Sequence, residues 1–259
     1  MQAPLDPLYA RMAADLKAGK PLVITTHVAL CDNRVIHCGN SARGDGDKPG
    51  KNLYWGGAAG FKATFDASRA WRRVLLDGGD GEVILQRAVY RLRLKRPSAR
   101  WRALGVKAGF DVYLVGLGYR GTRIAQASDA FIRQVLGEGG ETLTLPTGLK
   151  LAVGGQGHIV GYAGHNHLMD APDHMFPRAT RKRPVGFFAL ACMTAPYLAR
   201  HLPGKERRAL LLTRTFMYPG AFTIDGLARA LAAGGTQREV YMGGVREYAR
   251  CQKRPVKAI

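Results

Sequence analysis

Two side chains that could act together in catalysis, His165 and Cys192, each follow a short apolar run of the chain. One run spans 158–163 and is followed by Gly164 and His165; the other spans 185–191 and ends at Cys192. Such runs indicate buried strands of a parallel sheet, and ligands bind beyond the carboxyl ends of these strands. A cysteine near a base is an activated nucleophile. The pattern therefore predicts nucleophilic catalysis, with a buried structural cysteine and a loop histidine as the alternative.

A second chemistry uses the same stretch of the chain. His165 and His167 are separated by one residue, and Asp170, Asp173 and His174 follow closely. Two histidines and a carboxylate beyond a strand can hold a hydrolytic zinc ion. The spacing differs from the His-x-His-x-Asp-His pattern of metallo-β-lactamase-like hydrolases, since Asp170 comes one position late. A metal-dependent hydrolase at His165, His167 and Asp170 is therefore the less favoured prediction, and we expect neither a metal nor another cofactor.

The elements that must position these side chains alternate between strand and helix patterns. Because strands that alternate with helices form βαβ units, the sequence predicts an α/β fold, a three-layer sandwich around a mostly parallel, doubly wound sheet of about five or six strands. The predicted central strands end at Leu30, Val115, Ala163, Ala191 and Thr213. Three predicted helices have Asp6, Thr194 and Thr223 as their N-caps, and two more are expected over 52–61 and from Ile124.

The domain organisation is predicted to be simple. No linker or internal repeat divides the chain, so 1–259 is expected to form one domain. Residues 82–96 alternate in part between polar and apolar, which indicates a half-exposed strand. We therefore expect a basic hairpin or side sheet near 83–102. The glycines Gly116, Gly118 and Gly121 predict a turn between a strand and the helix that follows it.

The segments 159–166 and 187–192 resemble the caspase-like cysteine peptidases, which include caspases, legumains, gingipains and clostripain. Members of this group share a hydrophobic strand that ends in His-Gly and a second that ends in Ala-Cys. The resemblance implies a caspase-like fold, with Cys192 as the nucleophile and His165 as the general base or acid. It also implies an oxyanion hole from the backbone N–H groups of Cys192 and of the residue after His165, which here is Asn166. Gly164 and Asn166 are then expected to lie against a peptide or protein substrate.

The end of the first predicted strand carries an acidic residue, Asp32. In caspase-like proteins the end of this strand contributes to the pocket for the residue before the scissile bond, so the resemblance implies cleavage after Lys or Arg. The alternative is an Asx turn in which Asp32 or Asn33 bonds the local backbone.

The chain is strongly basic, with a formal net charge of +20 over 259 residues. The excess is densest between 69 and 107, and its core is Arg91, Arg93, Lys95, Arg96, Arg100 and Arg102. These side chains could bind nucleic acid or an acidic partner, so a non-catalytic binding module is the alternative function. No apolar stretch is long enough to span a membrane. A secretory signal is also not recognisable, so we expect a cytoplasmic protein with its four cysteines reduced.

Overall fold

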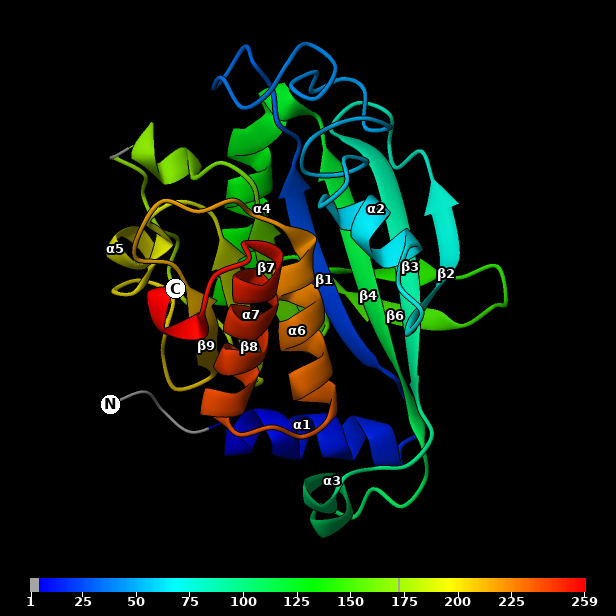
Figure 1. Ribbon diagram of the computed structural model, residues 1–259. Coiled ribbons are helices and arrows are strands. Elements are labelled where there is room, and N and C mark those ends of the chain that lie inside the picture. Colours follow the sequence, from blue (N-terminus) through cyan, green and yellow to red (C-terminus); the bar gives the residue numbers. More distant parts are fainter. Residues whose placement is uncertain (1–4, 172) are drawn as a thin grey trace.

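The centre of the computed structural model, which describes residues 5–171 and 173–259, is a seven-stranded sheet (Figure 1). The strand order is β2-β3-β4-β1-β7-β8-β9. The strands are β1 (Leu22–Ala29), β2 (Trp71–Asp77), β3 (Ile84–Leu94), β4 (Phe110–Tyr119), β7 (Ile159–Ala163), β8 (Val185–Leu190) and β9 (Arg207–Leu212). A separate antiparallel hairpin consists of β5 (Glu141–Thr144) and β6 (Lys150–Val153).

The five predicted central strands are confirmed as β1, β4, β7, β8 and β9, and each pairs with its neighbour in parallel. Counted in chain order, these parallel strands lie in the order 2-1-3-4-5, so the strand order reverses between β1 and β7. In doubly wound sheets, ligands bind beyond the carboxyl ends of the strands at such a reversal. The topology therefore singles out the edge of the sheet where β1 and β7 end.

The half-exposed strand predicted at 82–96 is confirmed as β3, although the sheet is wider than predicted. β2 and β3 form an antiparallel hairpin, and β3 pairs with β4 from Ile84↔Tyr119 to Leu94↔Phe110. The basic segment therefore extends the main sheet at one edge and does not form a side sheet.

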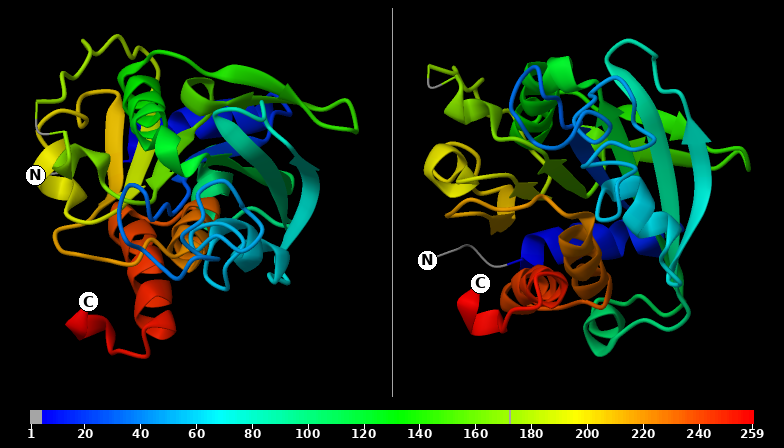
Figure 2. Two further views of the ribbon diagram at one scale, coloured as in Figure 1. Left: turned by 90° about the horizontal axis from the view of Figure 1, so that it is seen from above. Right: turned by 45° about the horizontal axis from the view of Figure 1, so that its top comes forward.

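Helices cover both faces of the sheet, an arrangement compatible with a three-layer sandwich (Figure 2). One face carries α1 (Asp6–Lys17), α2 (Phe61–Asp66), α6 (Ala221–Ala232) and α7 (Gln237–Cys251); the other carries α4 (Ile124–Leu136) and α5 (Thr194–Leu198). A short helix, α3 (Ala99–Ala103), lies at the lower end of the molecule in Figure 1. Single 3-10 turns are η1 (Gly121–Arg123), η2 (Gly154–Gln156), η3 (His167–Met169) and η4 (Val256–Ala258).

Alternation along the buried strands builds two apolar cores. In β1, Leu22 and Ile24 belong to the core under α1 and α6, whereas Val23 belongs to the core under α4. Successive strand side chains point to opposite faces, so a strand between two helical layers is apolar at nearly every position. All eight residues of β1 are buried.

Two local predictions are wrong, and packing against distant residues explains both. The helix expected from Asn52 begins only at Phe61, because the Asn52 side chain binds both backbone groups of Cys31 and thereby holds a turn. The turn expected at Gly116 and Gly118 is instead part of β4. A Cβ at Gly116 would lie 2.1 Å from the Phe61 ring, so this glycine makes room for an aromatic side chain.

Helix starts were predicted less well than helix bodies. α1 begins at Asp6, but Leu5 holds the N-cap position. Thr194 is the first residue of α5, and Thr223 lies inside α6. The predicted α4 and its stop at Gly137 are confirmed. α7 was not predicted, although Thr236 and Glu239 form a capping box at its start.

Candidate active site

His165 and Cys192 lie on neighbouring loops at the carboxyl edge of the sheet. β7 and β8 are adjacent and pair up to Ala163↔Leu190. His165 follows β7 by two residues, and Cys192 follows β8 by two. Parallel neighbours that end at the same level deliver their next residues to one place, as the sequence predicts.

Direct hydrogen bonds hold the two loops together. The Asn166 side chain donates Nδ2–H to the carbonyl oxygen of Cys192 at 2.8 Å, and the Gly164 N–H donates to the Leu190 carbonyl at 3.2 Å. Asn166 is 4% exposed, and its Oδ1 accepts the Leu168 N–H at 3.2 Å, which caps η3. The buried Asn166 amide therefore stabilises the turn after His165 and also fixes the position of this turn relative to Cys192.

Gly164 occupies a conformation that favours glycine. Its φ is +151°, and an added Cβ would lie 3.0 Å from the Ala29 carbonyl oxygen at the end of β1. The glycine thus lets the loop that carries His165 leave the sheet close to β1.

An acidic side chain orients the His165 ring. His165 Nε2 lies 2.7 Å from Asp170 Oδ2, and the His165 carbonyl accepts the Tyr162 hydroxyl at 2.6 Å. The His165 side chain is only 11% exposed. Within residues 5–171 and 173–259, Nδ1 has no hydrogen-bond partner, so the carboxylate fixes one ring nitrogen and leaves the other for a reacting group.

The Cys192 thiol is partly exposed and contacts the backbone of the segment that follows β9. The Met217 N–H points at Sγ from 3.5 Å, and the Met217 carbonyl oxygen lies 3.6 Å from it. The next residue, Met193, has a φ of +51°, which is uncommon for a residue with a side chain. Strained backbone of this kind gathers at functional sites, where the surrounding structure must hold it.

Tyr54 also approaches the thiol, and sequence reasoning missed it. Burial raises the pKa of Tyr54 to about 12, and the nearby Tyr218 and Cys192 add to the effect. Tyr54 belongs to the segment between β1 and α2, and its ring lies 6.3 Å from that of Tyr218. No pattern in the sequence marks Tyr54 or Met217, since both come near Cys192 only in the folded chain.

Asp32 forms the Asx turn that was the alternative prediction. Its Oδ1 accepts the Arg34 N–H at 2.9 Å, and the Arg34 guanidinium contacts Oδ2 at 2.6 Å. Asp32 is 3% exposed, and the hydrogen bonds from Arg34 hold its pKa below the usual range. In this conformation Arg34 occupies the carboxylate that a basic substrate side chain would need.

The prediction that all four cysteines are reduced is wrong for two of them. Cys31 and Cys38 form a disulfide, whereas Cys192 and Cys251 are free. The bridge closes the start of the long loop after β1, the same loop that contains Asp32.

The alternative metal site lacks support from the geometry. Across residues 5–171 and 173–259, no group of three or more His, Cys, Asp or Glu side chains is arranged to hold a metal ion. The contact between Asp170 and His165 Nε2 is therefore interpreted as orientation of the ring.

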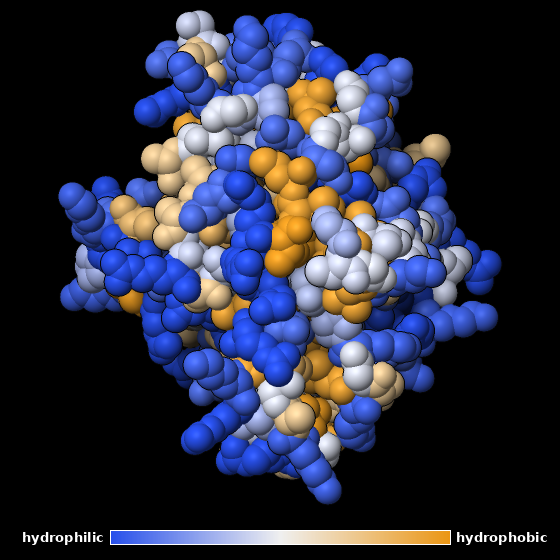
Figure 3. Space-filling view, turned by 90° about the vertical axis from the view of Figure 1, so that its right-hand side faces the viewer, coloured by the Kyte–Doolittle hydropathy of each residue, from blue (hydrophilic) through white to orange (hydrophobic). Residues whose placement is uncertain are grey.

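Several arginines of the basic segment have carboxylate partners. Arg91 and Arg93 both approach Asp111, at 3.7 and 3.2 Å, and Arg100 lies 3.5 Å from Asp6. Figure 3 shows that hydrophilic residues cover most of the face on the right-hand side of Figure 1, with a narrow apolar strip along its middle. The ion pairs reduce the charge that Arg91 and Arg93 can offer to a polyanion.

Comparisons with protein-family models, with curated proteins and with solved structures found no match. In the part of the chain that the structure describes, no helix is long and apolar enough to cross a membrane.

Proposed function

We propose that the chain is a caspase-like cysteine peptidase in which Cys192 is the nucleophile and His165 the general base and acid. The observation that carries the proposal is the pair of loops after β7 and β8, joined by the Asn166–Cys192 hydrogen bond of 2.8 Å. Further support comes from the 2-1-3-4-5 order of the parallel strands, since the loop after β7 borders the reversal of strand order and the loop after β8 is its neighbour.

The reaction proceeds in two halves. His165 takes the proton of the Cys192 thiol, and the sulfur attacks the carbonyl carbon of the scissile peptide bond. The tetrahedral intermediate collapses as the protonated His165 gives its proton to the leaving amine, which leaves a thioester on Cys192. Water, deprotonated by His165, then attacks the thioester and releases the carboxylate product and the free thiol.

Two backbone donors are suited to the oxyanion of the intermediate. Within the described residues, the N–H groups of Asn166 and Cys192 make no hydrogen bond. Donors of this kind, aimed at the developing charge, contribute several kcal/mol to catalysis. The Asp170 carboxylate acts as a positioning residue, because it holds the ring through Nε2.

Cleavage after Lys or Arg is a further part of this proposal, and it requires Asp32 to exchange its partner. A basic substrate side chain must displace Arg34, whose guanidinium now binds the Asp32 carboxylate. Because Arg34 is itself 57% exposed, such an exchange costs little solvation. Asp32→Asn should then lower kcat/KM for basic peptides about tenfold and leave neutral peptides unaffected.

The Cys31–Cys38 disulfide bears on the cellular compartment that is expected for such a peptidase. Disulfides persist mainly in oxidising compartments. A cytoplasmic location therefore predicts that the Cys31–Cys38 bridge is reduced in the cell, which trapping of thiols in intact cells would test.

The test compares the two free cysteines. Cys192→Ala should abolish cleavage of a peptide library, and His165→Ala should do nearly the same, since the members of a catalytic unit are not additive. Cys251→Ala is the matched control and should retain full activity, because Cys251 is an exposed thiol at the end of α7.

Alkylation gives a second measurement that needs no substrate. Iodoacetamide should modify Cys192 faster than Cys251, and His165→Ala should remove the difference. Full activity of Cys192→Ala, or equal slow labelling of both thiols in an otherwise folded protein that cleaves no peptide, would refute the proposal.

A binding module remains the second candidate function, and the net charge of +20 favours it. Arg91, Arg93 and Lys95 are the residues to neutralise. Binding that is dominated by phosphate contacts must weaken steeply with salt, so a lack of affinity for mixed RNA or DNA at low salt would exclude this candidate.

A further inference from the structure

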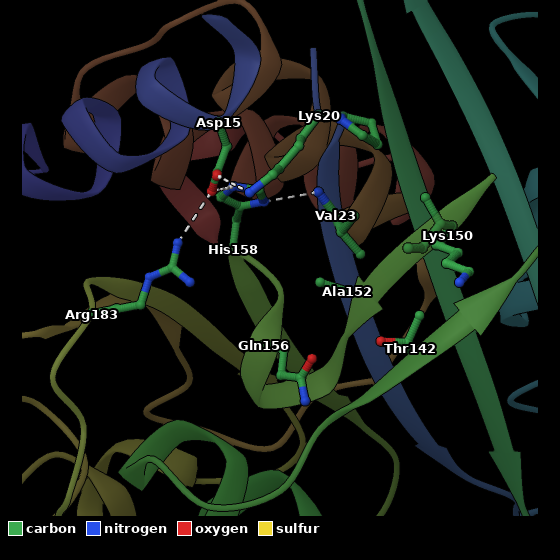
Figure 4. A pocket seen from close by; sticks show the side chains of 11 residues that line it. Asp15, Lys20, Val23, Thr142, Lys150, Ala152, Gln156, His158 and Arg183 are labelled. Carbon is green, nitrogen blue, oxygen red and sulfur yellow. Dashed lines mark hydrogen bonds and ion pairs between the residues drawn. The ribbon is translucent and has the colours of Figure 1, made fainter. Parts of the chain in front are cut away.

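A pocket of about 310 Å³ lies between α1, the start of β1 and the β5–β6 hairpin (Figure 4). Its walls include residues at the amino ends of two central strands. Val23 is the second residue of β1, and His158 directly precedes β7. His165 and Cys192 follow the carboxyl ends of β7 and β8, so the pocket lies at the opposite edge of the sheet from the candidate active site. It is independent of the proposed peptidase function.

The pocket has a fixed polar wall. The Val23 N–H donates to His158 Nδ1 at 3.1 Å, so Nε2 carries the ring proton and faces Asp15 Oδ2 at 3.1 Å. A ring whose Nδ1 accepts this N–H is neutral, and burial lowers the pKa of His158 in the same direction. Figure 4 shows Asp15 between His158, Lys20 and Arg183 on this side of the pocket.

Cations outnumber carboxylates among the lining residues. Lys20, Lys150 and Arg183 line the pocket together with one acidic residue, Asp15. Lys20 and Arg183 hold Asp15 only at 3.4 and 3.5 Å, and their side chains are 67% and 63% exposed. Such exposed ion pairs contribute little to the stability of the fold, so Lys20 and Arg183 can turn toward a ligand at a small cost in free energy.

The pocket also contains a third cation, Lys150, and an apolar wall. Lys150 lies across the pocket from Asp15 and makes no ion pair in the described part of the chain. Pro21 and Ala152 supply accessible apolar surface, and the buried Val23 and Leu151 lie behind it. A pocket of this volume is at the small end of ligand sites, which combine an apolar lining with a few polar groups.

We propose that this pocket binds a small phosphomonoester, with the phosphate between Lys20, Lys150 and Arg183 and the organic part against Pro21 and Ala152. A phosphomonoester carries a charge of about −1.5 to −2 at pH 7, which matches the excess of cations over Asp15. Ammonium and guanidinium groups bind phosphate oxygens through strong, charge-assisted hydrogen bonds.

The test is calorimetric titration of the full chain with adenosine monophosphate, adenosine and inorganic phosphate. Adenosine monophosphate should bind at one site, inorganic phosphate more weakly, and adenosine not at all. Lys150→Gln and Arg183→Gln should each weaken binding of adenosine monophosphate about tenfold or more, since each removes a charged hydrogen bond. Lys107→Gln removes an exposed charge outside the pocket and should change nothing.

Three results would overturn the proposal. Adenosine monophosphate that does not bind excludes the ligand class, and adenosine that binds equally well excludes recognition of the phosphate. A loss of affinity in Lys107→Gln as large as in Lys150→Gln would show that the net charge of the chain, and not this pocket, attracts the anion. Circular dichroism of each variant separates these outcomes from a failure to fold.

Discussion

Removal of the Asn166 side chain tests the contact on which the candidate active site depends. In Asn166→Ala, the Cys192 carbonyl loses its donor at 2.8 Å and the Leu168 N–H loses its acceptor at 3.2 Å. Each hydrogen bond contributes about 0.5–1.5 kcal/mol, and a buried group left without a partner costs about 1–3 kcal/mol. Because Asn166 is 4% exposed, water cannot easily replace the amide, and we expect the free energy of unfolding to fall by roughly 2–4 kcal/mol.

The same change should lower activity, since the amide sets the distance between the two loops. A displacement of about 1 Å in a catalytic arrangement can cost a factor of about one hundred in rate. Urea unfolding gives the loss of stability, and kcat/KM on a cleaved peptide gives the loss of activity. Asn40→Ala is the matched control, because Asn40 accepts only the local Arg43 N–H in an exposed turn and its loss should cost less than about 1 kcal/mol.

A second variant separates the two hydrogen bonds of Asn166. Asn166→Asp keeps an acceptor for the Leu168 N–H but presents a carboxylate to the Cys192 carbonyl. We expect it to be as inactive as Asn166→Ala. Wild-type stability in Asn166→Ala, within about 0.5 kcal/mol, would refute the energetic reasoning, and full activity in Asn166→Asp would refute the role of the contact in catalysis.

Three further predictions concern stability. Burial lowers the pKa of His27 from 6.5 to about 4, so the unfolded state binds the proton more tightly, and roughly 3 kcal/mol of stability present above pH 6.5 should be lost as the pH falls toward 4. Urea unfolding at several pH values measures this loss, and His27→Gln should flatten it. Reduction of the Cys31–Cys38 bridge should lower the free energy of unfolding by roughly 2.5 kcal/mol, and Cys38→Ser should remove the effect of reductant. Gly161→Ala puts a Cβ 2.1 Å from the buried Phe188 ring and should cost about 1–3 kcal/mol, whereas Gly78→Ala, with open space around it, should not.

Opposite results would contradict each line of reasoning. A pH dependence that persists unchanged in His27→Gln would assign the effect to other groups, such as the Asp15–His158 pair. Equal stability with and without reductant would mean that the loop after β1 is ordered by its other contacts. A neutral Gly161→Ala would show that β7 and β8 can separate enough to admit a methyl group.

The spacing of apolar residues along the chain and its composition were enough to predict the central strands of the sheet and helix α4. The strands β1, β4, β7 and β8 are buried on both faces, so their sequences are apolar at nearly every position and are recognisable without any partner. β9, at the edge of the sheet, is recognisable from its apolar run 209–212, although it is only partly buried. The same holds for α4, whose apolar positions repeat at helical spacing and whose stop, Gly137, has a positive φ. The convergence of His165 and Cys192 on one edge follows from this framework.

The contacts that shape the candidate site depend on residues far apart in the sequence. Asn166 reaches Cys192 across 26 residues, and the Met217 N–H reaches its sulfur from the segment after β9. Likewise, Gly116 lies within β4 because the Phe61 ring fills the space of a side chain. Local sequence encodes the conformational preference of a segment, whereas these outcomes depend on which distant atoms occupy the neighbouring volume, and only the packed tertiary structure decides that.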